Sequence, residues 1–337
     1  MLSDRRQKVL AALIEEYVAR ALPVGSRTLT ERYQLGVSPA TVRNELSVLE
    51  DGGYIAQPHT SAGRIPTDQG YRAFVDDLLS QEGGEQEDER CQEAADKLRK
   101  SASELDDLVE QTSEALTRLT DCLSIVLAPS VLDLHIKQLS LISLTPTNAL
   151  VVVVTEDGQV FNRHMDFAEE VSSDELARVQ HLLNEVFGGN TLHDIEHGLG
   201  RGMSEAFADP LVRMALDEVL SCLREGEGSR AHSLGFSSLL SQPEFSQSEA
   251  VLPVMQVLED DTVLLHILDD LTSTDEDLSV QIGKENKTEG LSGVSVVASR
   301  YGRGEAEGVV AVIGPTRMDY SKVIQAVRAA SAALGES

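Results

Sequence analysis

Aromatic residues and cysteine are scarce in this 337-residue chain. Aromatics make up 4% of the residues, tryptophan is absent, and the three cysteines, Cys91, Cys122 and Cys222, lie far apart. Cysteines with such spacing build neither a disulfide framework nor a zinc site. No apolar run reaches the roughly 18 residues of a membrane span, and the start "MLSDRRQKVL" lacks the apolar region of a signal peptide. We therefore expect a cytoplasmic protein with reduced cysteines.

Positive charge is also in short supply, but unevenly so. The chain has 28 basic and 56 acidic residues, for a formal charge of −28, yet residues 1–75 contain nine basic and eight acidic residues. Almost all of the acidic excess therefore lies after residue 75. Because a strongly acidic surface repels another polyanion, the first 75 residues are the part of the chain suited to approach DNA.

The first 80 residues follow the element order of a winged helix-turn-helix. Apolar residues recur at helical spacing over residues 4–20, and Ser26 is predicted to cap a second helix over 27–35. Ser38 is predicted to cap a third helix that begins at Pro39 and ends at Gly52-Gly53. "YIAQPHTSAGRIPT" then predicts short extended pieces around a loop. Helix, helix, turn, helix and hairpin is the order typical of that DNA-binding fold.

The third helix has one apolar and one polar side. Val42, Leu46 and Leu49 should pack on the first two helices. On the other side, Asn can pair with adenine, Arg with guanine or phosphate, and methyl groups can meet thymine. A loop arginine entering a minor groove is a common way to read groove width. The predicted DNA-binding residues are Ser38, Ala40, Thr41, Arg43, Asn44 and Ser47 of the helix, and His59, Thr60, Ser61 and Arg64 of the loop. The alternative is a small helical domain with a solvated polar face.

The rest of the chain predicts an α+β domain that holds an insertion. Residues 81–96 are acidic and polar, as in a linker. From Leu98 to Leu123 an apolar seam predicts either a coiled-coil dimer or, as we favour, one long core helix. The chain becomes β-rich after Pro129, with helices between the strands, and residues 226–272 interrupt this pattern. The predicted divisions are 1–80, 81–96, 97–225, 226–272 and 273–337. Ser173 is predicted to cap the helix that follows it.

Four stretches resemble the heat-inducible transcription repressor HrcA family. The first runs from "RQKVLAALIEEY" to "GYRAFVDDLL" near the N-terminus, and the others are "SSLLSQPEF" (237–245), "IGKEN" (282–286) and "VIGPTRMDYSKVI" (312–324). They follow one another in the order that the family has, so the resemblance spans nearly the whole chain.

The resemblance implies more than the residues alone. It implies a winged helix-turn-helix at 1–80, a GAF-like α/β domain at 97–225 and 273–337, and a dimerisation segment inserted at 226–272. It also implies a homodimer that binds an inverted-repeat operator, represses chaperonin and related chaperone genes, and is released on heat stress. The chaperonin GroEL is the implied partner that favours the active repressor.

Two other hypotheses remain open. One is a winged-helix regulator controlled by a small ligand in the GAF-like domain, although no ligand-binding residue can be named. The other is a zinc hydrolase, because "HDIEH" (193–197) places His193 and His197 on one helical face with Glu196 nearby. A polar surface helix explains that motif more simply. We expect no enzyme, cofactor or metal.

Overall fold

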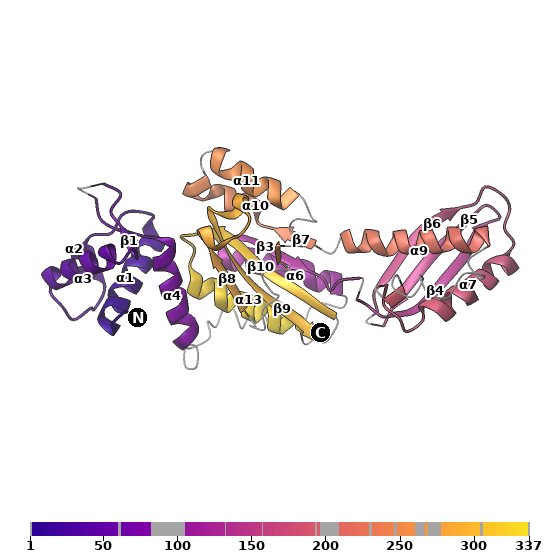
Figure 1. Cartoon of the computed structure of the whole chain (residues 1–337), viewed down its shortest axis with the longest axis horizontal. Helices are drawn as coiled ribbons and strands as arrows, with labels where there is room; N and C mark the ends of the chain where they lie inside the picture. Colours follow the sequence, from indigo (N-terminus) through magenta and orange to yellow (C-terminus); the bar gives the residue numbers. More distant parts are fainter. Residues whose placement is uncertain are drawn as a thin grey trace.

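The chain forms three bodies in a row (Figure 1). The computed structural model describes residues 2–59, 62–81, 105–131, 133–156, 158–192, 194–195, 209–228, 231–245, 248–259, 267–268, 278–303 and 306–335. We call residues 2–81 the N-terminal domain, the described parts of 105–127 and 231–335 the central domain, and the described parts of 131–228 the inserted domain. This mixed α/β, multidomain organisation agrees with the predicted fold class at that level.

The N-terminal domain has the element order that the sequence predicts. It contains α1 (Asp4–Arg20), α2 (Ser26–Arg32), α3 (Pro39–Asp51), the paired strands β1 (Ile55–Ala56) and β2 (Ile65–Pro66), and α4 (Asp68–Gln81). The predicted cap of α2 is wrong. Gly25 is the N-cap, with extended backbone, and its carbonyl accepts the Leu29 N–H at 3.2 Å. The helix ends at Arg32 because Tyr33 returns to extended backbone and packs against the core.

Helical spacing of apolar residues builds the core of this domain. Side chains from every element of the domain are buried, among them Leu10, Leu13, Leu29, Val42, Leu46, Leu49, Ile55, Tyr71 and Val75. Burying one Leu, Ile or Val side chain is worth about 1.5–3 kcal/mol relative to leaving it exposed. The burial of this shared face therefore holds the short elements together.

The central domain is built on a five-stranded antiparallel sheet in the order β7-β3-β10-β9-β8. The strands are β3 (Leu123–Leu127), β7 (Ala231–Leu234), β8 (Leu278–Ile282), β9 (Val294–Arg303) and β10 (Ala306–Pro315). Both faces are buried. In β10, Val310 and Val312 belong to the core shared with α6 (Leu105–Thr120) and α13 (Tyr320–Gly335). Val309, Ala311 and Ile313 pack on the other side, against α10 (Phe236–Ser241), η2 (Pro243–Phe245) and α11 (Ser248–Glu259).

Helix α6 is a core helix in the part of the seam that the structure describes. Val109, Thr112 and Leu116 are buried, and α6 packs on α13 and β3. This is the interpretation that we favoured over a coiled coil. Leu98 and Ala102 of the predicted seam, and the predicted linker apart from Gln81, lie outside the described residues.

The inserted domain has a separate three-stranded antiparallel sheet in the order β4-β5-β6. Its strands are β4 (Ile136–Thr145), β5 (Asn148–Thr155) and β6 (Val160–Asp166), and α7 (Ser173–Phe187) and α9 (Pro210–Gly228) cover one face (Figure 1). The predicted cap of α7 is off by one residue. Ser172 caps it, in a reciprocal arrangement with Glu175, so Ser173 is already helical.

The position of the insertion differs from the predicted 226–272. The chain leaves the central sheet after β3 and returns at β7, which pairs with β3, and residues 236–245 and 251–257 pack on the central sheet. The segment with its own sheet and core is instead 131–228. Alternation of apolar residues identifies strands, but it does not tell which sheet a strand joins, because pairing is a long-range choice. Two short 3-10 turns, η3 (Gly283–Glu285) and η4 (Glu289–Leu291), lie between β8 and β9.

Candidate nucleic-acid interface

Helix α3 begins as its sequence predicts. The Ser38 hydroxyl accepts the Thr41 N–H at 3.2 Å, and Pro39 occupies the first turn. Val42, Leu46 and Leu49 are at most 1% exposed and pack against α1 and α2. The predicted cap, first residue and apolar side of this helix are therefore confirmed.

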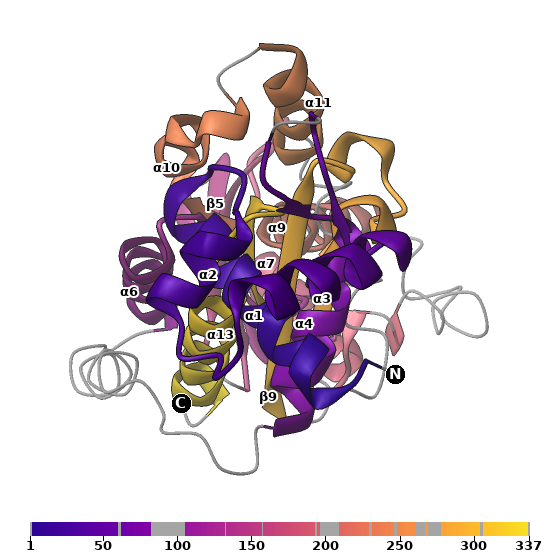
Figure 2. The same ribbon diagram turned by 90° about the vertical axis from the view of Figure 1, so that its left-hand side faces the viewer.

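The polar side of α3 is uncovered. Ser38, Ala40, Arg43, Asn44 and Ser47 are exposed, whereas Thr41 is half-buried next to its cap. Helix α3 lies at the end of the molecule, and Figure 2, which looks at that end, shows it in front of the central and inserted domains. No described residue forms a hydrogen bond or ion pair with the side chain of Arg43, Asn44 or Ser47. These three side chains are therefore free to meet a partner from outside.

The glutamates of α3 are neutralised within the domain. Glu45 pairs with Arg6 at 3.0 Å and with Arg5 at 3.5 Å, both on α1. Glu50 pairs with Arg64 at 2.9 Å. Internal pairing lowers the repulsion that these carboxylates would exert on a phosphate backbone. The uncovered side of α3 thus carries one unpaired cation, Arg43, with no unpaired glutamate of the same helix beside it.

The loop between β1 and β2 is tied back to the domain. The Gln57 side chain donates to the Ala62 carbonyl at 2.8 Å, and Arg64 exchanges two backbone hydrogen bonds of 2.8 Å with Val24. A Cβ at Gly63 would lie 2.6 Å from the Val24 backbone, so glycine permits this close approach. His59 is exposed, and Thr60 and Ser61 lie outside the described residues.

Arg64 differs from its expected placement at a free loop tip. Its side chain is 24% exposed, and Nε and Nη2 both donate to Glu50 Oε2, at 3.2 and 2.9 Å. A contact with a minor groove would require this ion pair to open. The glutamate at the end of α3 was the sequence signal for such a pair.

One further cation was not predicted for this surface. Arg27 lies in the first turn of α2, which packs on α3, and its side chain is 88% exposed beside Glu31 at 3.4 Å. A lone arginine in a short helix gives no pattern that singles it out. Its exposure makes it a candidate contact to a backbone phosphate.

The zinc hypothesis rests on residues that the structure does not describe. His193, Glu196 and His197 lie outside the described residues, and Asp194 of the same motif accepts the Thr191 hydroxyl at 2.8 Å in a helix-capping turn. Within the described ranges, no group of three His, Cys, Asp or Glu residues could hold a metal ion. Burial raises the pKa of the Cys122 thiol to about 12, with Asp121 adding to the effect. No described helix is long and apolar enough to span a bilayer.

Comparison with known proteins decides the family. Residues 106–324 match the model of the HrcA protein C-terminal domain. A heat-inducible transcription repressor HrcA of Streptomyces avermitilis is 41% identical over 340 residues, covering 100% of this chain and 98% of its own length. The chain belongs to the HrcA family.

Other HrcA proteins agree over similar lengths. The heat-inducible transcription repressor HrcA of a Nocardioides species is 38% identical and covers 98% of this chain, with 96% of its own length matched. The heat-inducible transcription repressor HrcA of Desulforudis audaxviator is 35% identical, over 96% of this chain and 94% of its own length. A solved structure described as a hypothetical protein at 2.2 Å resolution matches with a TM-score of 0.70 and 25% identity, over 100% of this chain and 98% of its own. The HrcA resemblance therefore extends over all three bodies of the chain.

Proposed function

We propose that this protein is a homodimeric repressor of heat-shock genes that binds an inverted-repeat operator and leaves it on heat stress. In this proposal α1–α3 and the β1–β2 hairpin form a winged helix-turn-helix, with α3 as the recognition helix, and the central domain is the GAF-like domain. The protein carries out no catalysis. The printed names of its relatives, heat-inducible transcription repressors, support this function.

The uncovered side of α3 is the observation that carries the proposal. Arg43, Asn44 and Ser47 are exposed and unpartnered within the described structure, on a helix fixed from behind by three buried side chains. Asn and Arg are the side chains that make bidentate contacts to adenine and guanine in a major groove.

An inverted-repeat operator requires a two-fold protein, and the inserted domain offers a surface for it. One face of its sheet is packed under α7 and α9, and on the opposite face, where neither helix packs, an apolar patch lies among polar residues such as Ser140 and Asn162. On that face Ile142 is 47% and Val160 58% exposed, with half-buried Leu150, Val152 and Val154 between them. We therefore assign the dimer contact to the outer face of β4–β6, which we call the open sheet face, rather than to residues 226–272.

The experiment is a mobility-shift titration of the full chain on inverted-repeat DNA from the promoter regions of its chaperone genes. We expect tight binding to that DNA, weak binding to a scrambled sequence, and loss of binding after heating to a stress temperature. Added GroEL should raise operator affinity. Equal affinity for scrambled DNA would overturn the repressor proposal. Binding that ignores heat and GroEL but responds to a small metabolite would favour the ligand-controlled regulator.

A further inference from the structure

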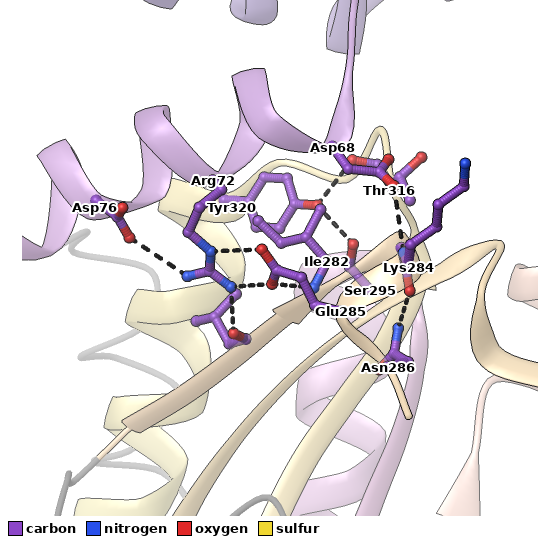
Figure 3. A network of polar contacts seen from close by, with 12 residues as sticks. Asp68, Arg72, Asp76, Ile282, Lys284, Glu285, Asn286, Ser295, Thr316 and Tyr320 are labelled. Atoms are coloured by element: carbon purple, nitrogen blue, oxygen red, sulfur yellow. Dashed lines mark hydrogen bonds and ion pairs between the residues drawn. The ribbon is translucent and has the colours of Figure 1, made fainter. Parts of the chain in front are cut away.

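The N-terminal domain meets the central domain at a polar contact built largely from the three downstream sequence blocks. Helix α4 lies against β8 and α13 (Figures 1 and 3), and the end of α1 is hydrogen-bonded to Arg317, just before α13. We call this contact the joint. Its residues are Val18, Asp68, Tyr71 and Arg72 on the N-terminal side, and Gln242, Glu244, Gly283, Lys284, Glu285, Arg317 and Tyr320 on the central side.

The first half of the joint is centred on Arg72 of α4. Its guanidinium donates to Glu285 through Nε at 2.9 Å and through Nη2, and Nη2 also donates to the Val280 carbonyl at 2.6 Å (Figure 3). Glu285 is oriented in turn by the Ile282 N–H at 2.9 Å. Burial disfavours the charged form of Glu285, but the hydrogen bonds from Arg72 and Ile282 outweigh it and lower its pKa. A planar guanidinium held at three acceptors has one orientation.

The same half has a second, backbone contact. Asp68 accepts the Lys284 N–H at 3.3 Å. Gly283 has a φ of +54°, and a Cβ there would lie 2.6 Å from the Asp68 carboxylate. The close approach of α4 to η3 therefore depends on glycine at this position.

The second half of the joint is centred on Arg317. It donates to the Val18 carbonyl at the end of α1 at 2.8 Å and to Glu244 through Nε at 2.6 Å. Gln242 accepts a further hydrogen bond at 3.2 Å. The Arg317 side chain is only 12% exposed. One largely covered cation thus connects α1 to η2, two elements that are far apart in sequence.

Two buried tyrosines close the space between the halves. Tyr71 and Tyr320 are 3% and 1% exposed, and their ring centroids are 5.6 Å apart. The Tyr320 hydroxyl is shared with Ser295 at 2.7 Å and donates to the Thr316 carbonyl at 2.9 Å. Because polar contacts lie on both sides of the two rings, a rotation of the N-terminal domain against the central domain would break some of them.

We propose that Arg72, Glu285 and Arg317 are positioning residues for operator binding, because they fix the orientation of α3 relative to the central domain, which carries the inserted domain with its dimer contact. This inference rests on the proposed function. Two recognition helices reach successive half-sites only if their separation and direction match the DNA. When the two recognition helices cannot engage both half-sites at the same time, the additional affinity from the second half-site is lost. The affinity of one recognition helix for one half-site remains.

The test compares one half-site with the full inverted repeat, using full-length Glu285→Gln and Arg317→Met variants. Glu307→Gln is the matched control, since Glu307 pairs with Arg300 at 2.9 Å within the central sheet and does not touch the N-terminal domain. Hydrogen–deuterium exchange of the same proteins, measured without DNA, reports whether the backbone at the joint opens more often. If Arg317→Met does not fold, Glu285→Gln decides the test, because the ion pair of Glu285 is more exposed and its loss should disturb folding less.

We expect Glu285→Gln and Arg317→Met to bind the inverted repeat at least about tenfold more weakly and the half-site as wild type does. Exchange should quicken in residues 68–75 and 278–286 and stay unchanged in 39–51. Glu307→Gln should behave as wild type throughout.

Three results would overturn the inference. The variants could bind the inverted repeat as wild type does, with or without faster exchange at the joint. They could lose half-site and inverted-repeat binding equally, which would place the damage inside the N-terminal domain. Finally, the wild-type protein could bind neither the half-site nor the inverted repeat. This result would also overturn the proposed function, and the wild-type titration alone would reveal it.

Discussion

Helix α3 and the sheet of the inserted domain are both half-covered elements, and they differ in what the uncovered half carries. Behind α3 lie Val42, Leu46 and Leu49, and in front lie Arg43, Asn44 and Ser47. Behind the sheet lie α7 and α9, whereas Ile142 and Val160 remain exposed in front. Hydrogen-bonding groups without partners suit base edges, and an apolar surface without cover suits another apolar surface. In the function that we propose, the first surface meets DNA and the second meets another copy of the chain.

The largest expected effect is at the open sheet face. Ile142→Asp would place an unpaired carboxylate in the dimer contact, which costs several kcal/mol when it is buried. We expect a monomer by analytical ultracentrifugation and a loss of inverted-repeat affinity of roughly 100-fold or more. Because Ile142 is 47% exposed in the single chain, the variant should still fold.

Met214→Asp is the matched control for that variant. Met214 is 38% exposed on α9, on the helical side of the same domain, and its substitution adds the same charge. It should leave the dimer intact. A dimeric Ile142→Asp protein, or a monomeric Met214→Asp protein, would contradict the assignment of the dimer contact to the open sheet face.

The next effect is at the uncovered side of α3. Asn44→Ala and Arg43→Ala should each weaken operator binding by about 1–3 kcal/mol and relax specificity at one base position, because each removes a base-edge contact. Competition titrations with single-base operator variants would measure both changes. Arg118→Ala removes the same charge from an exposed site on α6, 77% exposed, and should have no such effect. Wild-type affinity and specificity in both α3 variants would show that this side of the helix does not face DNA.

A smaller effect is expected at Arg64. Its guanidinium is already committed to Glu50, so Arg64→Ala should reduce operator affinity only a few-fold, by roughly 0.5–1 kcal/mol. Glu50→Gln should release Arg64 and tighten binding in the same fluorescence-anisotropy titration. A larger loss of operator affinity in Arg64→Ala than in Asn44→Ala would contradict this order. It would mean that the Arg64–Glu50 ion pair opens on DNA and that the loop contributes more to binding than α3 does.

The smallest expected effect is the pH-dependent contribution of the joint to thermal stability. Because the folded-state pKa of Glu285 is lowered, its ion pair stabilises the fold above the unfolded pKa of a glutamate, about 4.3, and this contribution is lost as pH falls through the lower folded value. Glu285→Gln should therefore lower Tm by roughly 1–3 °C at pH 7. The difference from wild type should shrink below pH 4. A difference that is the same at pH 7 and pH 3 would mean that the charge of Glu285 does not matter.

Local patterns predicted the N-terminal domain well and the rest less well. Cap, proline, apolar triad and terminal glycines all lie between Ser38 and Gly53, so short-range rules were sufficient for Ser38, Val42 and Gly52. The errors at Ser26 and Ser173 are shifts of one residue at helix starts, where adjacent positions compete for the cap. The misplaced insertion arose because β4–β6 and the central strands have the same alternation.

The sequence blocks that resemble the HrcA family contain most of the residues that tie the domains together, but nothing in them indicated which side chains pair. Arg72 and Glu285 are 213 positions apart, and Arg317 and Val18 are 299 apart. Glu50 at the end of α3 was a sequence signal for the Arg64 ion pair, but composition alone does not decide between that pair and a free surface charge.

The sequence by itself determined which residues of each helix and strand face inward, where the acidic excess lies, and which family the chain resembles, because these depend on neighbours a few positions away and on composition. The tertiary structure alone decided which sheet each strand joins, which arginines remain free for a partner, and how the N-terminal domain is held. Those outcomes depend on contacts between segments hundreds of residues apart, whose pairing has no local periodicity to reveal it.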